Sequence, residues 1–309
     1  MNHVVALPDE SWASQLSDIP GVQTVVWDMD GDPPRTDIAL VVPPYMGAGK
    51  SRLERLAGCA QLEAVQLVTA GYENVLPYLP TGVALANGAG IHDTSTAELA
   101  LALILSSLRG VPQAVRSADH GSWESLNGRR SLADRRVLVL GYGSIGHAIV
   151  RRLAPFEVSV TAVASRARDG DDLVDRVHGT DELPKLLPHH DVVIVVVPLS
   201  DATHHLVGAD FLAALPDGAL VVNVARGAVI DTDALISECA SGRLTAALDV
   251  TDPEPLPQGH PLWSTPGVLI TPHVGGATTA FEPRALSFLR GQLTRVGRGE
   301  ELSHVVATG

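Results

Sequence analysis

The sequence predicts an α/β protein made of two doubly wound domains, each built on a parallel sheet. Apolar strand-like runs alternate with helical stretches through almost all of its 309 residues, which is typical of parallel strands joined by helices. Three glycines with the spacing G-x-G-x-x-G stand between a strand-like run and a helical run. The first 130 residues, ahead of that strand, carry strand runs of their own. We therefore expect one domain to be inserted in the other.

The N-terminal part has the pattern of the first half of one domain. Its strands are expected at 22–26, 38–42, 65–68 and 83–85. A long apolar helix at 95–108 leads away from this domain, and a last helix at 279–295 returns to it. The expected boundaries are 1–99 with 277–309 for a flavodoxin-like domain, and 100–276 for an inserted Rossmann domain.

The glycine triplet is the strongest motif in the chain. It follows an apolar run at 137–140 that has the character of a buried strand, and apolar residues recur at helical spacing after it. Gly141 permits a tight turn, Gly143 lets a pyrophosphate approach the backbone, and Gly146 lets the helix pack on the strand. The free N–H groups at the start of that helix suit phosphates. This combination predicts a dinucleotide-binding domain.

The second strand of this domain, expected at 158–164, indicates which dinucleotide binds. It ends without the acidic residue that would hold the ribose 2′-hydroxyl of NAD, because Ala164 or Ser165 stands in that place. Arg166 and Arg168 follow, and their guanidinium groups suit a 2′-phosphate. NADP is therefore the expected cofactor, with NAD as the alternative. The later acidic residues reach the ribose only if the loop folds back: Asp169, Asp171 and Asp172.

Further strands and helices complete the inserted domain. The strands are expected at 191–197, 219–223, 245–249 and 268–270, and the helices near 183–187, 209–215 and 232–242. With the two strands named above, they make a six-stranded, doubly wound sheet.

Composition and charge limit the partners. The formal net charge of −13 disfavours nucleic acid and anionic membranes, so an anionic substrate must meet local cations. Neither a signal segment nor a membrane span is evident, and we expect a cytoplasmic protein. Cys59 and Cys239 lie outside any metal spacing. Two histidine pairs lack a third zinc ligand and are expected to be exposed loop residues, so no metal is predicted: His189 with His190, and His204 with His205.

From about Leu62 to the C-terminus, the chain resembles the D-isomer-specific 2-hydroxyacid dehydrogenase family, and within it the glyoxylate/hydroxypyruvate reductases. The segment 69–71 is similar to the family's substrate loop, and 96–100 to its domain-crossing helix. Three later segments are similar, in the same order, to those that carry the family's catalytic arginine, glutamate and histidine: 222–227, 247–256 and 271–276. The first 60 residues match only as a generic α/β pattern.

The residue types in these three segments fit the reduction of a 2-oxo acid. That reaction needs a cation for the carboxylate and carbonyl, a proton donor for the developing alkoxide and a fixed hydride source. Arg226 follows a predicted strand and offers a fork of donors, and His273 can pass a proton in either direction. Glu254 would hydrogen bond the His273 ring, fix its tautomer and stabilise its protonated form. Alone, each would be an ordinary surface or loop residue.

The resemblance also implies contacts with cofactor and substrate. Asp249 would accept a hydrogen bond from the nicotinamide carboxamide, or otherwise cap a turn. Ala70 and Gly71 would offer N–H groups to the substrate carboxylate, and Tyr45 would either set specificity or pack in its loop. The expected cofactor contacts are Thr96, Gly141, Gly143, Ser144, Ile145, Gly146, Ser165, Arg166, Arg168, Pro198, Thr203, Val224, Ala225, Asp249 and Gly275.

Together these features predict an NADP-preferring oxidoreductase that reduces a small 2-oxo acid, glyoxylate or hydroxypyruvate, to the D-2-hydroxy acid. Within the family, oxidation of formate or phosphite is the alternative. Outside enzymology, the alternative is a dinucleotide-sensing corepressor without turnover. The segment 109–130 is similar to the region through which family members dimerise, so a homodimer is expected.

Overall fold

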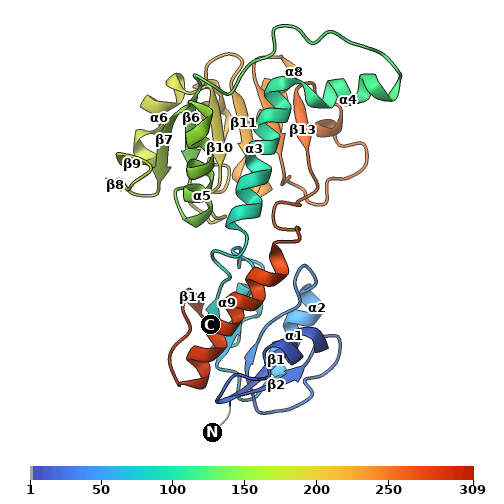
Figure 1. Ribbon diagram of the computed structural model, residues 1–309, viewed down its shortest axis with the longest axis vertical. Helices are drawn as coiled ribbons and strands as arrows, with labels where there is room; N and C mark the ends of the chain where they lie inside the picture. The colour runs from blue at the N-terminus through green and yellow to red at the C-terminus, as the bar shows by residue number, and fades with distance from the viewer. Residues whose placement is uncertain (1–2) are drawn as a thin grey trace. The chain divides into compact units, whose positions relative to one another are not determined.

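The protein is described here by a computed structural model covering residues 3–309, which divides into two compact units (Figure 1). The first unit comprises Met1–His92 and Thr279–Gly309, and the second comprises Asp93–Thr278. Helix α3 (Asp93–Arg109) belongs entirely to the second unit, because its buried residues pack in that unit's core. The boundaries therefore lie at 92/93 and 278/279, where the sequence suggested 99/100 and 276/277.

The sheet of the first unit has the strand order β14-β5-β4-β3-β1-β2. Strands β1 to β5 are parallel and follow the flavodoxin-like order, and β14 adds an antiparallel edge. Strands β1 and β14 were not predicted, being short runs at the ends of the chain. The strands are β1 (His3–Leu7), β2 (Val22–Val26), β3 (Ile38–Val41), β4 (Ala64–Gln66), β5 (Ala84–Ala86) and β14 (Val305–Thr308).

Helices cover both faces of this sheet. On one face, α1 (Glu10–Gln15) and α9 (Phe281–Gly297) pack with Val5 and Leu7 of β1. On the other face, α2 (Lys50–Leu53) and the 3-10 helix η1 (Glu54–Gly58) pack with Val4 and Ala6. Alternate residues of one strand therefore serve opposite cores, as the two-residue repeat of a strand requires. The unit also contains η2 (Leu76–Tyr78).

The second unit has an eight-stranded sheet in the order β13-β12-β11-β10-β6-β7-β9-β8. The six predicted strands are present and parallel, which gives a doubly wound sheet of the Rossmann type. Two short, polar strands were missed, and they form an antiparallel hairpin beside β7. The strands are β6 (Arg136–Leu140), β7 (Ser159–Ala164), β8 (Arg168–Asp169), β9 (Arg176–Gly179), β10 (Val192–Val195), β11 (Leu220–Asn223), β12 (Thr245–Leu248) and β13 (Val268–Ile270).

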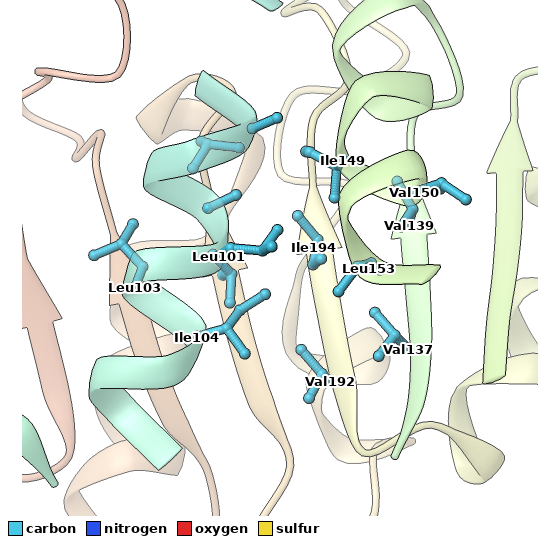
Figure 2. Close-up of a cluster of buried hydrophobic side chains, with 14 of the residues drawn as sticks. Leu101, Leu103, Ile104, Val137, Val139, Ile149, Val150, Leu153, Val192 and Ile194 are labelled. Carbon is cyan, nitrogen blue, oxygen red and sulfur yellow. The ribbon is translucent and has the colours of Figure 1, made fainter. Parts of the chain in front are cut away.

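The core of the second unit lies on both faces of this sheet. Figure 2 shows one face, where α3 and α5 direct Leu101, Ile104 and Leu153 toward Val137 and Val192 of the sheet. A separate buried cluster covers the other face beneath α7 and α8. Because both faces are covered, the central strands are almost continuously apolar, as expected of a parallel sheet.

The second unit has further α-helices and short 3-10 turns, and α4 follows α3 after a bend of 69°. They are α4 (Val111–Asp119), α5 (Ser144–Leu153), η3 (Ala154–Phe156), η4 (Thr180–Glu182), α6 (Leu183–Leu186), η5 (Leu187–His189), α7 (Ala209–Ala213), η6 (Gly227–Val229), α8 (Thr232–Ala240) and η7 (Pro261–Trp263). Within residues 3–309, no individual helix meets the length and hydropathy of a membrane span. The bent pair α3 and α4 meets them only when both helices are counted together.

Candidate functional site

The glycine loop between β6 and α5 has the geometry of a phosphate cradle. Gly141 has φ +110°, which disfavours other residues, and a Cβ on Gly146 would overlap the carbonyl oxygen of Gly141. A Cβ on Gly143 would meet no atom within 4 Å, so the space before the N-terminus of α5 is open. The N–H groups at that helix start and their dipole suit a pyrophosphate. The residues present therefore fit a dinucleotide.

The loop after β7 folds back onto the glycine loop. Ser165 and Arg166 are exposed directly after the strand. Arg168, in β8, donates from Nη2 to the carbonyl oxygen of Tyr142 at 2.7 Å. Asp171 accepts from the Tyr142 hydroxyl at 3.0 and 2.9 Å. The fold-back that the sequence left open is thus present, although Asp171 is engaged by Tyr142.

Arg226 lies on the loop after β11, and a buried asparagine holds that loop in place. Asn223 donates to the Arg226 carbonyl at 2.9 Å and accepts from the Ala225 N–H at 3.0 Å. A Cβ on Gly227 would overlap the carbonyl group of Thr251, so only glycine lets this loop contact the next one. The sequence reasoning missed Asn223, although it directly ends a predicted strand.

His273 and Glu254 come from different loops and meet at the same edge of the sheet. The His273 Nδ1 lies 2.5 Å from the Glu254 Oε1, and both side chains are about two-fifths exposed. The Thr251 N–H donates to the other Glu254 oxygen at 3.4 Å. Since a carboxylate only accepts, Nδ1 carries the hydrogen and Nε2 is left for a ligand.

Asp249 holds the loop that carries His273. Its buried carboxylate accepts from the Thr271 hydroxyl at 2.6 Å, and from the N–H groups of Val274 and Gly275 at 2.9 Å each. The His273 N–H donates to the Asp249 carbonyl at 2.8 Å. His273 itself has φ +52°, a left-handed conformation uncommon outside glycine. Asp249 therefore fixes the unusual backbone of the loop at His273, which is the turn-capping role considered as its alternative.

Other expected cofactor residues of the second unit surround the same sheet edge. Thr96 of α3 is buried, and its hydroxyl lies beside Gly275. Val224 and Ala225 are buried on the Arg226 loop. Thr203 donates to the Pro198 carbonyl at 2.6 Å, which closes the loop after β10. Ser144 donates its hydroxyl to Asp93 at 3.1 Å and leaves its N–H at the helix start.

The first unit holds the expected substrate loop in a fixed conformation. Asn87 donates to the Ala70 carbonyl at 2.8 Å, and the Thr69 hydroxyl donates to the Gly71 carbonyl at 2.8 Å. In a trans peptide the C=O and N–H point in opposite directions, so Asn87 directs the Gly71 N–H away from itself. The sequence reasoning did not identify Asn87, whose partner lies 17 residues away.

Tyr45 also lies in the first unit, within a stack of rings. Its ring centroid is 3.9 Å from that of Phe281 and 5.4 Å from that of His92. Partial burial raises the pKa of Tyr45, so its hydroxyl stays protonated. The packed-loop alternative for Tyr45 is thus the one that its ring contacts favour.

The histidine pairs differ from the expectation in one residue. His204 and His205 are exposed and stacked, with centroids 4.0 Å apart. His190 is buried, and its two ring nitrogens lie 2.7 Å from the Leu186 carbonyl and 2.9 Å from the Thr161 hydroxyl. It is therefore a structural core residue. Leu187 and Val192, on either side of it in the sequence, are also buried and hold this turn in the protein interior.

Comparison with known proteins places this geometry in a family. The model for the NAD-binding domain of D-isomer specific 2-hydroxyacid dehydrogenases matches residues 101–275. A glyoxylate reductase/hydroxypyruvate reductase from Homo sapiens is 33% identical over 72% of this chain and 70% of its own.

Two solved structures are similar over 99% of the chain. One is a D-isomer specific 2-hydroxyacid dehydrogenase from Xanthobacter autotrophicus Py2 in complex with NADPH and MES, 29% identical with a TM-score of 0.82 over 98% of its chain. The other is an NADPH-dependent glyoxylate/hydroxypyruvate reductase from Sinorhizobium meliloti in complex with NADP and malonate, 26% identical with a TM-score of 0.80 over 97% of its chain. The chain thus belongs to the D-isomer specific 2-hydroxyacid dehydrogenases, which are NAD(P)-dependent oxidoreductases.

Proposed function

We propose that this protein is an NADP-preferring reductase that converts glyoxylate or hydroxypyruvate to the D-2-hydroxy acid. The observation that carries the proposal is the 2.5 Å contact between Glu254 and His273, in which the loop of Glu254 also packs against the loop of Arg226 through Gly227 and Thr251. The relatives named for glyoxylate and hydroxypyruvate support the choice of substrate.

Each of the three residues has a distinct part in the reduction. Arg226 binds the substrate carboxylate and polarises its carbonyl group. His273 gives the proton on Nε2 to the carbonyl oxygen as negative charge develops there. Glu254 accepts from Nδ1 and holds the ring in the orientation that this transfer needs. When bound, the dinucleotide supplies the hydride.

The end of β7 supports the proposed cofactor preference. No acidic side chain stands directly after this strand to accept from a ribose hydroxyl, and Ser165 and Arg166 are exposed there instead. A 2′-phosphate dianion gains charge-assisted hydrogen bonds at such a place. The glycine loop would hold the pyrophosphate, and Thr96, Asp249 and Gly275 would lie at the nicotinamide end.

An assay with NADPH and NADH, each against glyoxylate, hydroxypyruvate and pyruvate, tests the proposal. We expect oxidation of NADPH with the first two acids, and a loss of kcat/KM of at least about 10²-fold in Arg226→Ala, because the transition-state charge loses its cation. Arg151→Ala, which removes an exposed arginine from α5, is the matched control and should keep full activity. Turnover of formate or phosphite without turnover of any 2-oxo acid would contradict the proposal, as would binding without turnover.

A further inference from the structure

We propose that Arg168, Tyr142 and Asp171 form a clasp that positions the glycine loop for either dinucleotide, and that Arg166 alone reads the 2′-phosphate. We call these three residues the Tyr142 clasp. The inference rests on the proposed function. It gives Arg166 and Arg168 different roles, although the sequence predicts the same contact with the 2′-phosphate for both.

The first half of the clasp acts on the backbone that faces the pyrophosphate. Tyr142 lies between Gly141 and Gly143, and Arg168 binds its carbonyl oxygen at 2.7 Å. Because a trans peptide directs C=O and N–H to opposite sides, this bond fixes the direction of the Gly143 N–H. Gly143 caps helix α5, beside the open space that a phosphate would fill. The pyrophosphate is common to NAD and NADP, so Arg168 serves both.

The second half of the clasp holds the tyrosine side chain. The Tyr142 ring is buried, and its hydroxyl donates to both oxygens of Asp171 at 3.0 and 2.9 Å. Burial, with the hydrogen bond to Asp171, raises the pKa of Tyr142, so the hydroxyl remains a donor at any physiological pH. Asp171 is itself fixed, because it accepts from the Leu173 N–H at 2.9 Å. The Arg168 guanidinium lies 5.9 Å from the ring centroid, within cation–π range.

The hairpin of β8 and β9 connects the clasp to the sheet. Strand β9 pairs with β7, with Ala164 opposite Gly179, and β8 pairs with β9, with Arg168 opposite Val177. A Cβ on Gly170 would overlap the Val174 carbonyl oxygen, so the turn is tight. The segment 165–167 is therefore a short bridge between β7 and a hairpin that is held at the glycine loop.

Arg166 stands on that bridge with a different environment. It is exposed, and across residues 3–309 it makes neither a hydrogen bond nor an ion pair. Its donors are available to an anion, whereas Arg168 is engaged with the Tyr142 carbonyl. The two arginines differ in this respect although they are only two positions apart.

Dissociation constants for NADPH and NADH, measured by calorimetry on the full-length protein, test the division of work. Arg166→Ala should weaken NADPH binding about 10- to 100-fold and leave NADH within about twofold, since only one ligand carries the 2′-phosphate. Arg168→Ala should weaken both cofactors by the same factor, about 5- to 10-fold. Tyr142→Phe keeps the ring and loses the hydroxyl, and it should weaken both by about threefold. Arg151→Ala should change neither.

Several outcomes would overturn the inference. If Arg168→Ala weakens NADPH alone, Arg168 is a second phosphate ligand and not part of a clasp. If neither Arg168→Ala nor Tyr142→Phe changes NADH binding, the clasp has no role in positioning. Thermal unfolding of each variant identifies a loss of binding that comes from a loss of structure. A wild-type protein that binds NADH as tightly as NADPH would contradict the proposed cofactor preference and the role of Arg166. The effect of Arg168→Ala on the two dissociation constants would still test the Tyr142 clasp.

Discussion

Glu254 is the residue whose replacement reports most directly on His273. In Glu254→Gln the side chain keeps its shape but loses the carboxylate oxygen that accepts from the His273 Nδ1 and fixes the ring. We expect kcat to fall on the order of 10²-fold, while the Kd of NADPH stays within about twofold. Steady-state kinetics with glyoxylate, together with calorimetry for NADPH, measure the two quantities.

The exposed carboxylate of Glu282, on α9, gives the matched control. Glu282→Gln should retain wild-type kcat. An unchanged kcat in Glu254→Gln would show that the contact with His273 has no part in proton transfer.

The sequence supplied the residue types of the site but not the partners that hold them. Arg226, Glu254 and His273 lie in sequence segments similar to those of the family, and the structure brings Glu254 and His273 into contact. Asn223 supports Arg226 through backbone atoms, and a hydrogen bond to a carbonyl leaves little trace in residue type. The contact of Tyr142 with Asp171 spans 29 residues, and it depends on a hairpin whose short, polar strands give no hydrophobic pattern.

Among the structural elements, the glycine loop offers two substitutions that should fail for different reasons. Gly146→Ala places a methyl group against the Gly141 carbonyl oxygen, so the strand and helix must separate. We expect a loss of about 1–3 kcal/mol in the free energy of unfolding, measured by urea titration of the apoprotein. Gly143→Ala meets open space and has an ordinary φ of −95°, so it should leave stability unchanged and still weaken NADPH binding.

These two variants control for each other. Equal losses of stability would show that both glycines serve only the fold. Unchanged NADPH binding by Gly143→Ala would show that the pyrophosphate does not bind beside Gly143.

The turn between η5 and β10 contains a buried titratable group that makes stability depend on pH. Burial lowers the pKa of His190 below its ordinary value of 6.5. As the pH falls below 6.5, this histidine therefore takes up a proton in the unfolded chain before it does so in the folded chain. The free energy of unfolding falls as the pH falls. Above pH 6.5 both states are neutral and this contribution is constant.

Urea titrations at about pH 7.5 and pH 5.5 measure the effect, with His190→Gln as the variant that cannot titrate. Wild type should lose more stability than His190→Gln between the two values. An equal loss in both proteins would assign the acid sensitivity to other groups.

At the scale of the whole molecule, α4 and the turn after it present an apolar surface. No residue of α4 is buried, Val115 is half exposed, and Trp123 is 97% exposed. The turn is ordered against the helix, because Glu124 accepts hydrogen bonds from Gln113 at 2.6 Å and Ser117 at 2.7 Å. An ordered, exposed tryptophan is typical of an interface, so we expect a homodimer through this surface.

Light scattering after gel filtration tests this expectation. Val115→Glu combined with Trp123→Ala should convert the dimer to a monomer at micromolar concentration, since both remove apolar area from the contact. Trp263→Ala, which removes another half-exposed tryptophan, should leave the dimer intact. A monomeric wild type would contradict the expectation.

The division into two units could be predicted because a helix leads out of one strand pattern and a second helix returns to it. The exact positions at which the chain passes from one unit to the other could not be predicted. The first turn of α3 is polar and gives no apolar pattern, and its hydrogen bonds, such as Ser95 to Thr278 at 2.8 Å, tie it to the second unit. Strand β14 also escaped prediction, because half of its residues face solvent at the edge of a sheet.

The positions of β14 and α9 in the sequence determine the order in which the two units fold during synthesis. The first unit needs Ala285 and Leu289 for its core and β14 for its edge, and these residues follow the whole second unit in the sequence. The whole of Asp93–Thr278 leaves the ribosome before them, and domains generally fold as units during synthesis. The second unit is therefore expected to fold while the first unit is still incomplete, and strands β1 to β5 keep an apolar face exposed to chaperones until α9 has been synthesised.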